Sequence, residues 1–176
     1  MLEVKIKNYE LPSFDPIQFH WILNSESISV NIKFIEFKKK LKDVFLQNYE
    51  KLLMYSYISF FNEFKQLDWI IKRKDTLSKA NLQIQKAIVI QQLMRLTIVL
   101  DKEIYPSNKR LSHSCAKSKQ RNKVKKLSER IKSLNSFDEM KKIKTETKSM
   151  INNLMPKKDY VWNRRKFLNE FQKIKF

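Results

Sequence analysis

Glycine is absent from this chain of 176 residues, which holds one cysteine and four prolines. Without glycine there is no Gly-rich phosphate loop, no dinucleotide-binding fingerprint and no nucleophile elbow. Tight turns that need a positive φ are then expected at Asn or Asp. The single cysteine, Cys115, can form no internal disulfide, which fits a reducing compartment. We therefore expect an intracellular protein of the cytoplasm or an organelle matrix.

Acidic residues are scarce as well. The chain has 37 Lys and Arg against 18 Asp and Glu, a formal net charge of +19. A coding bias toward AT-rich codons would favour lysine over arginine, but it would not remove glutamate. A large unbalanced positive field attracts polyanions, above all nucleic acid. The charge therefore predicts a nucleic-acid partner.

Long hydrophobic runs are also missing. The longest uncharged run in the most apolar region, Leu52–Asn62, is too short to cross a bilayer. Residues 1–12 alternate apolar and charged side chains and contain no signal-peptide core. Apolar residues still make up 42% of the chain, enough for a real core. We expect no membrane span.

The positive charge is concentrated in the last third of the chain. Residues 1–108 hold 16 basic and 12 acidic residues, whereas residues 109–176 hold 21 and 6. Such asymmetry is typical of nucleic-acid or membrane interaction. The sequence predicts a helical bundle domain over residues 1–106 and a basic helical nucleic-acid-binding segment over residues 107–176.

Apolar spacing in the first part of the chain indicates helices. Residues 1–12 alternate with the period of one short strand, and Asp15 and Pro16 are suited to cap and begin a short helix. A stripe of period 3.6 then predicts one long helix or two through residues 30–71. Within it, residues 52–71 are apolar on almost every face, which predicts burial at the centre of a bundle.

Capping signals divide the rest of the chain into further helices. Asp75 can cap a helix that carries an apolar stripe ending at Leu100, and residues 105–108 stop it. A later helix has the apolar seam Val124, Leu127, Ile131 and Leu134. Ser136 with Glu139 forms a capping box, and Asp159 can cap a last helix. The stripe of the helix after Asp75 consists of Leu77, Ile84, Ile88, Leu93, Leu96 and Leu100. The prediction is an all-α helical bundle with a basic C-terminal helical extension and one short N-terminal strand.

The run from Lys109 to Lys126 is the main candidate binding site. It contains eight basic residues and no acid, so self-repulsion favours a bound anion over a merely solvated face. On a helix, one flank of the seam carries Arg121, Lys125 and Lys132, and the other flank carries Lys119, Lys123, Lys126 and Arg130. The predicted nucleic-acid contacts here are Lys109, Arg110, Lys117, Lys119, Arg121, Lys123, Lys125, Lys126 and Arg130.

A second candidate is the segment Tyr160–Lys166. Its Arg164, Arg165 and Lys166 are suited to phosphates, and Trp162 offers a stacking platform for an unpaired base. The alternative for Trp162 is an ordinary core anchor. We include Trp162, Arg164, Arg165 and Lys166 among the predicted nucleic-acid contacts.

Metal and cofactor sites are not expected. A zinc site needs about four ligands, and the only histidines are His20 and His113, the second close to Cys115. Cations near Cys115 would lower the pKa of its thiol. With only two histidines, the sequence shows no Ser/His/Asp or Cys/His arrangement for nucleophilic catalysis.

One catalytic pattern remains as an alternative. Asp15, followed by Glu36 and Lys38, resembles the carboxylate and Glu-x-Lys arrangement of metal-dependent nucleases of the PD-(D/E)xK type. The resemblance covers three residues and requires a strand pair, whereas residues 30–45 have helical spacing.

The function predicted from the sequence is non-catalytic nucleic-acid binding, largely through phosphates, as a subunit of a ribonucleoprotein or protein–DNA assembly. RNA is favoured over duplex DNA because the basic groups are not confined to one recognition helix. The alternatives are the nuclease and a helical protein-interaction module with a basic tail that meets an acidic protein or an anionic membrane.

Overall fold

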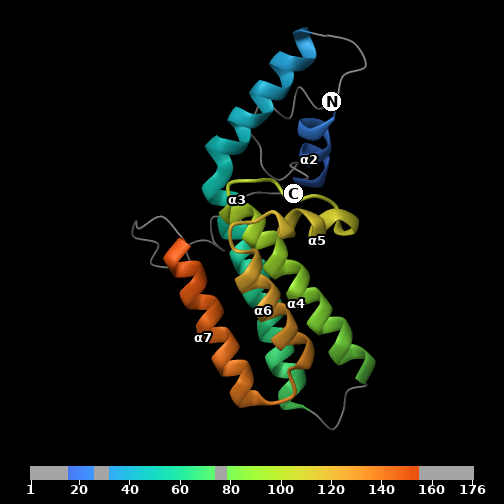
Figure 1. Ribbon diagram of the computed structural model, residues 1–176, viewed down its shortest axis with the longest axis vertical. Coiled ribbons are helices and arrows are strands. Elements are labelled where there is room, and N and C mark those ends of the chain that lie inside the picture. Colours follow the sequence, from blue (N-terminus) through green and yellow to red (C-terminus); the bar gives the residue numbers. More distant parts are fainter. Residues whose placement is uncertain (1–15, 26–31, 74–78, 155–176) are drawn as a thin grey trace, which may run out of the picture.

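The computed structural model describes residues 16–25, 32–73 and 79–154 (Figure 1). These residues form α-helices and turns and no strand, so the all-α prediction is confirmed for them. The strand expected in residues 1–12 and the helix expected after Asp159 lie outside the described residues. The described helices are α2 (Pro16–Asn24), α3 (Ile32–Lys72), α4 (Lys79–Leu100), α5 (Asn108–Ala116), α6 (Arg121–Ser133) and α7 (Phe137–Leu154).

The single long helix α3, of 41 residues, runs the length of the bundle (Figure 1). α4 returns along the C-terminal part of α3, and α6 packs on α4. α7 packs on both α3 and α6, and α2 lies beside the N-terminal part of α3. α5 crosses the bundle near its middle and contacts α4 (Figure 1). One continuous core joins these helices, with Phe60, Phe64, Leu93, Leu96, Ile131 and Ile143 among its fully buried side chains.

The apolar part of α3 is not buried on every side, so that expectation was wrong. Phe60, Phe64 and Leu67 are buried, but Tyr55 is 45% exposed and Trp69 is 50% exposed. The main neighbours of α3 among the described helices are α2, α4 and α7. One side of the helix therefore faces solvent in the described part of the protein.

The expected stripe of α4 is buried at Leu93 and Leu96, but the N-terminal part of the helix departs from it. Ile84 is 58% exposed, whereas Gln85 and Lys86 are buried. The amide Nε2 of Gln85 donates to the backbone oxygen and to Oε2 of Glu63, at 3.1 and 2.9 Å. The ammonium of Lys86 donates to the backbone oxygen of Lys132 at 3.0 Å. These bonds compensate for burying polar groups, which apolar spacing alone does not anticipate.

α4 ends in a Schellman motif without glycine. The N–H of Lys102 donates to the Val99 oxygen at 2.9 Å, and the N–H of Glu103 donates to the Ile98 oxygen at 3.1 Å. Lys102 has φ 61°, the left-handed conformation that this position requires. The expectation that Asn or Asp would take such a position was wrong here. Because the chain has no glycine, Lys102 adopts the left-handed conformation despite the steric clash of its Cβ.

The elements of the basic segment follow the predicted spacing closely. Val124, Leu127, Ile131 and Leu134 are all buried, so the seam of α6 is confirmed. The N–H of Glu139 donates to Oγ of Ser136 at 3.3 Å, as the capping box predicts. The sequence did not resolve α5 as a helix separate from α6.

Candidate nucleic-acid interface

α6 carries cations on both flanks of its buried seam. Arg121, Lys125 and Lys132 lie on the flank toward α4 and α5, and all three are exposed. Lys123 and Lys126 lie on the other flank and are also exposed. The helical repeat of 3.6 residues explains this division, as the sequence predicts.

Arg130 differs from the other cations of α6. It is half-buried and forms an ion pair with Glu146 of α7. This contact links α6 to α7 and partly neutralises the guanidinium. Arg130 is therefore placed to join two helices.

The turn between α5 and α6 is fixed by hydrogen bonds. The N–H of Arg121 donates to the Ser118 oxygen at 3.2 Å, and the N–H of Gln120 donates to Oγ of Ser118 at 3.0 Å. The N–H of Lys119 donates to Oδ2 of Asp101 at 3.3 Å. Lys117 and Lys119 are exposed at this turn. Their backbones are thus held in place while their side chains extend into solvent.

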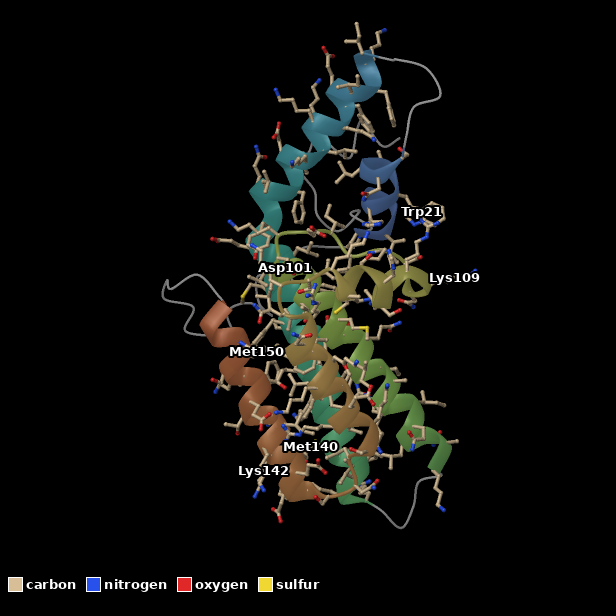
Figure 2. All side chains as sticks on the ribbon, viewed as in Figure 1. Trp21, Asp101, Lys109, Met140, Lys142 and Met150 are labelled. Atoms are coloured by element: carbon tan, nitrogen blue, oxygen red, sulfur yellow. The ribbon has the colours of Figure 1, made fainter. Side chains whose placement is uncertain are left out.

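The helix α5, the turn after it and the first half of α6 carry eight exposed cations, and we call this group of side chains the basic corner. Lys109 lies at the beginning of α5 (Figure 2). Within the described residues, no acidic side chain forms an ion pair with any of its members. The first turns of α5 and α6 contain no acid either. The basic corner consists of the exposed side chains Lys109, Arg110, Lys117, Lys119, Arg121, Lys123, Lys125 and Lys126.

A pocket of about 290 Å³ lies between α4, α5 and α6, beside the basic corner. Its buried floor includes Ile90, Cys115, Val124 and Ser128. Its exposed lining includes Ser112, Ala116, Arg121, Asn122, Lys125, Glu129 and Lys132. The sequence did not predict this pocket. The sequence feature that points to it is Ser128, a polar residue that follows Leu127 on the apolar side of α6.

A larger groove of about 430 Å³ lies between α3 and α7. Its apolar lining includes Tyr57, Phe61 and Phe137. The ammonium groups of Lys72 and Lys141 lie 4.7 and 4.6 Å from the ring centre of Phe137. The groove therefore combines aromatic surface with a cationic margin.

Cys115 is buried in α5. Burial, with a smaller contribution from the charge of Asp101, raises the pKa of its thiol to about 11. The expectation of a lowered pKa was wrong, because desolvation of the thiolate outweighs the surrounding cations.

The two histidines, His20 and His113, lie on different helices, α2 and α5. Nδ1 of His20 lies 2.9 Å from the Ile104 oxygen and links α2 to the segment after α4. His113 is exposed on α5. In residues 16–25, 32–73 and 79–154, no group of three or more His, Cys, Asp or Glu side chains is arranged to hold a metal ion.

The residues of the nuclease pattern do not meet on a strand pair. Glu36 and Lys38 both lie in α3, where residues two apart point to different sides of the helix. The ammonium of Lys38 donates to the Ser25 oxygen and lies 5.2 Å from the ring centre of Phe34. Asp15 lies outside the described residues. The predicted contacts Trp162, Arg164, Arg165 and Lys166 lie outside them as well.

Comparisons with protein families, with characterised proteins and with solved structures find no match to this chain. In the part of the chain that the structure describes, no helix has the length and apolar character needed to cross a membrane.

Proposed function

We propose that this protein is a non-catalytic RNA-binding subunit of a larger ribonucleoprotein assembly, and that it holds phosphates on the basic corner. The observation that carries the proposal is the gathering of eight exposed cations that have no acidic partner among the described residues. Like charges so close together repel one another, and bound phosphates would neutralise them.

The backbone around the basic corner supports anion binding. The N–H groups at the first turn of a helix favour a negative charge, and the first turns of α5 and α6 have no acidic side chain. The N–H groups of Arg110 and Arg121 already donate to backbone oxygens, so the other N–H groups of these turns would meet the anion. Hydrogen bonds hold the turn between the two helices in one conformation. The backbone of the turn therefore loses little conformational freedom when a ligand binds, and the ordering cost falls on the exposed lysine and arginine side chains.

The distribution of cations favours RNA over duplex DNA. A recognition helix concentrates its contacts along one face that enters the major groove. Here the cations belong to two helices and a turn, and the two flanks of α6 point in different directions. Such a surface is better suited to the irregular path of a folded or single-stranded RNA.

Exposed apolar side chains support membership of an assembly. Isolated ones are common on protein surfaces, but neighbouring ones indicate contact with a partner, and Trp69 and Ile84 line one groove between α3 and α4. The larger ones are Trp21 (64% exposed), Ile32 (70%), Ile35 (58%), Leu46 (50%), Trp69 (50%) and Ile84 (58%).

The salt dependence of RNA binding tests the proposal. Contacts to about five to eight phosphates give a log–log slope of about −4 to −7 by counterion release. Changing Lys119, Lys123 and Lys126 together to Gln is expected to flatten the slope by about two to three units. The matched control changes Lys42, Lys142 and Lys148, which are exposed on α3 and α7, to Gln. Equal slopes for the two triple variants, or no binding by the wild type, would contradict the proposal.

A second candidate function, the helical protein-interaction module, is favoured by the groove between α3 and α7. Its aromatic lining and its Lys65, Lys72, Lys141 and Lys144 suit an amphipathic helix with acidic side chains. A photo-crosslinking residue in place of Phe61, in the groove, or Lys123, in the basic corner, compares the two candidates in the native assembly. Protein adducts at both positions would favour the module. RNA adducts at position 123 would favour RNA binding.

A further inference from the structure

We propose that the pocket between α4, α5 and α6 receives one unstacked nucleobase of the RNA whose phosphates lie on the basic corner. This inference rests on the proposed function and extends it to a base-binding site. Arg121 and Lys125 belong both to the basic corner and to the lining of the pocket. A strand whose phosphates contact these two side chains would therefore have a base within reach of the pocket.

The size and lining of the pocket fit a flat aromatic ring. Its volume of about 290 Å³ is small, at the lower end of what small-molecule ligands occupy. Ile90, Met94, Cys115 and Val124 provide an apolar surface against which a ring can pack. Because burial raises the pKa of the Cys115 thiol to about 11, the floor carries no thiolate charge at neutral pH. Neutral apolar surface suits a base and does not suit a phosphate.

Ser128 supplies a polar group that has no partner. It is 4% exposed, it lines the pocket, and its Oγ has no hydrogen-bond partner among the described residues. Two other buried hydroxyls, those of Thr97 and Thr147, donate to the backbone oxygens four residues earlier, at 2.7 and 2.8 Å, whereas the buried hydroxyl of Ser56 on α3 also has no partner among the described residues. A buried hydroxyl without a partner is unfavourable. The Oγ itself has almost no accessible surface, so a ligand would bond to it after the Ser128 side chain rotates toward the pocket, which would relieve that cost. The edge of a nucleobase offers both donors and acceptors.

Alternative ligands satisfy fewer of these features. An alkyl chain would pack on the floor but leave the Ser128 hydroxyl without a partner. A free phosphate would meet Arg121 and Lys125 at the mouth but would find no cation at the buried floor. The carboxylate of Glu129 also lies at the mouth, where it pairs with Lys132 at 2.8 Å. Of these ligand classes, a nucleobase in a strand fits best, because the base can pack on the apolar floor while its phosphates meet the cations at the mouth.

Variants that fill the pocket test the inference. Ser112→Phe and Ala116→Phe place a ring at the mouth from exposed positions on α5, so the fold should be retained. The matched control is Ser149→Phe, at an exposed position of α7. The probes are a fluorescein-labelled single-stranded RNA and an abasic strand of the same length, measured by anisotropy over a salt series. Melting curves check folding.

The wild type is expected to bind the base-containing strand about tenfold more tightly than the abasic strand. Either filling variant should lose that difference while its salt slope and its affinity for the abasic strand stay as in the wild type. If the filling variants keep the tenfold preference, the base pocket is wrong and the phosphate surface stands. If the wild type binds neither strand, the proposed function fails and the inference with it.

Ser128→Ala provides a second measurement, which does not depend on filling the pocket with a larger side chain. Because the hydroxyl has no partner in the protein, its removal should leave the melting temperature unchanged or raise it. The same variant should reduce the preference for the base-containing strand severalfold. An unchanged preference would overturn the role given to Ser128. A lowered melting temperature would show that the hydroxyl has a structural partner, which also overturns it.

Discussion

The ammonium of Lys86, on α4, donates a hydrogen bond of 3.0 Å to the backbone oxygen of Lys132, in the last turn of α6. Lys86 is only 2% exposed. Oxygens in the last turn of a helix lack partners within the helix, and a positive charge is favourable there. This bond attaches the end of α6 to α4 and so positions the basic corner relative to the bundle. Burial lowers the pKa of Lys86, opposed by the charge of Glu139.

The lowered pKa of Lys86 predicts how stability depends on pH. Between its folded pKa and the ordinary value of 10.5, the unfolded chain binds more protons than the folded one. The contribution of Lys86 to the free energy of unfolding therefore rises with pH across this window. Urea unfolding should show the wild type gaining stability relative to Lys86→Met as pH approaches 10.5.

An exposed lysine provides the control for that experiment. Lys142 projects from α7 (Figure 2), and Lys142→Met, measured over the same pH series, controls for the loss of one lysine. A difference between Lys86→Met and the wild type that does not change with pH would contradict the prediction. At neutral pH, Lys86→Ala should cost about 1–3 kcal/mol, because the Lys132 oxygen loses its partner.

The left-handed residue at the end of α4 predicts a stabilising substitution. Lys102→Gly should raise the free energy of unfolding by about 0.5–1 kcal/mol, since glycine adopts φ near 61° without the clash of a Cβ. Denaturant unfolding measures the change. Lys102→Ala is the control, because it removes the charge and keeps the Cβ, and it should remain close to the wild type. If both variants gained the same free energy of unfolding, the loss of the lysine charge, and not the removal of the Cβ, would explain the gain.

The buried thiol of Cys115 should be unreactive in the folded protein. Its pKa is raised from the ordinary 9.0 to about 11, so its contribution to folding stability is present below 9.0 and is lost as pH rises toward 11. Iodoacetamide at neutral pH should modify Cys115 only as fast as the protein opens, and urea should accelerate the reaction. Intact-mass measurement follows it. Rapid and complete modification without urea would contradict the burial of this thiol.

Arg130 should behave differently from its neighbours on α6. Because it is paired with Glu146, Arg130→Gln should leave the salt slope of RNA binding unchanged. Lys126→Gln, on the same flank, should flatten the slope by about one unit. A double-mutant cycle between Arg130 and Glu146 should give a coupling of about 0.2–1 kcal/mol, typical of an ion pair that solvent reaches. Equal changes in slope would place Arg130 on the binding surface.

Local patterns predicted the elements that depend on neighbouring residues. Pro16 begins α2, Ser136 caps α7, and the seam from Val124 to Leu134 is buried. Each depends on backbone geometry or on a 3.6-residue period that can be read within one helix. The positions of the cations on either side of the α6 seam follow from the same period. The all-α class was therefore readable from the sequence.

Contacts between helices decided which charged residues are buried or paired and where the pocket lies, because apolar spacing does not specify which neighbour a helix meets. Lys86 is buried since α6 ends beside it, and Arg130 is paired since α7 brings Glu146 alongside. The pocket exists because α5 crosses α4 near α6 and leaves Ser128 unpartnered. The sequence by itself determined the helices and the basic charge. Only packing between distant segments decided which cations extend into solvent and where a ligand can enter.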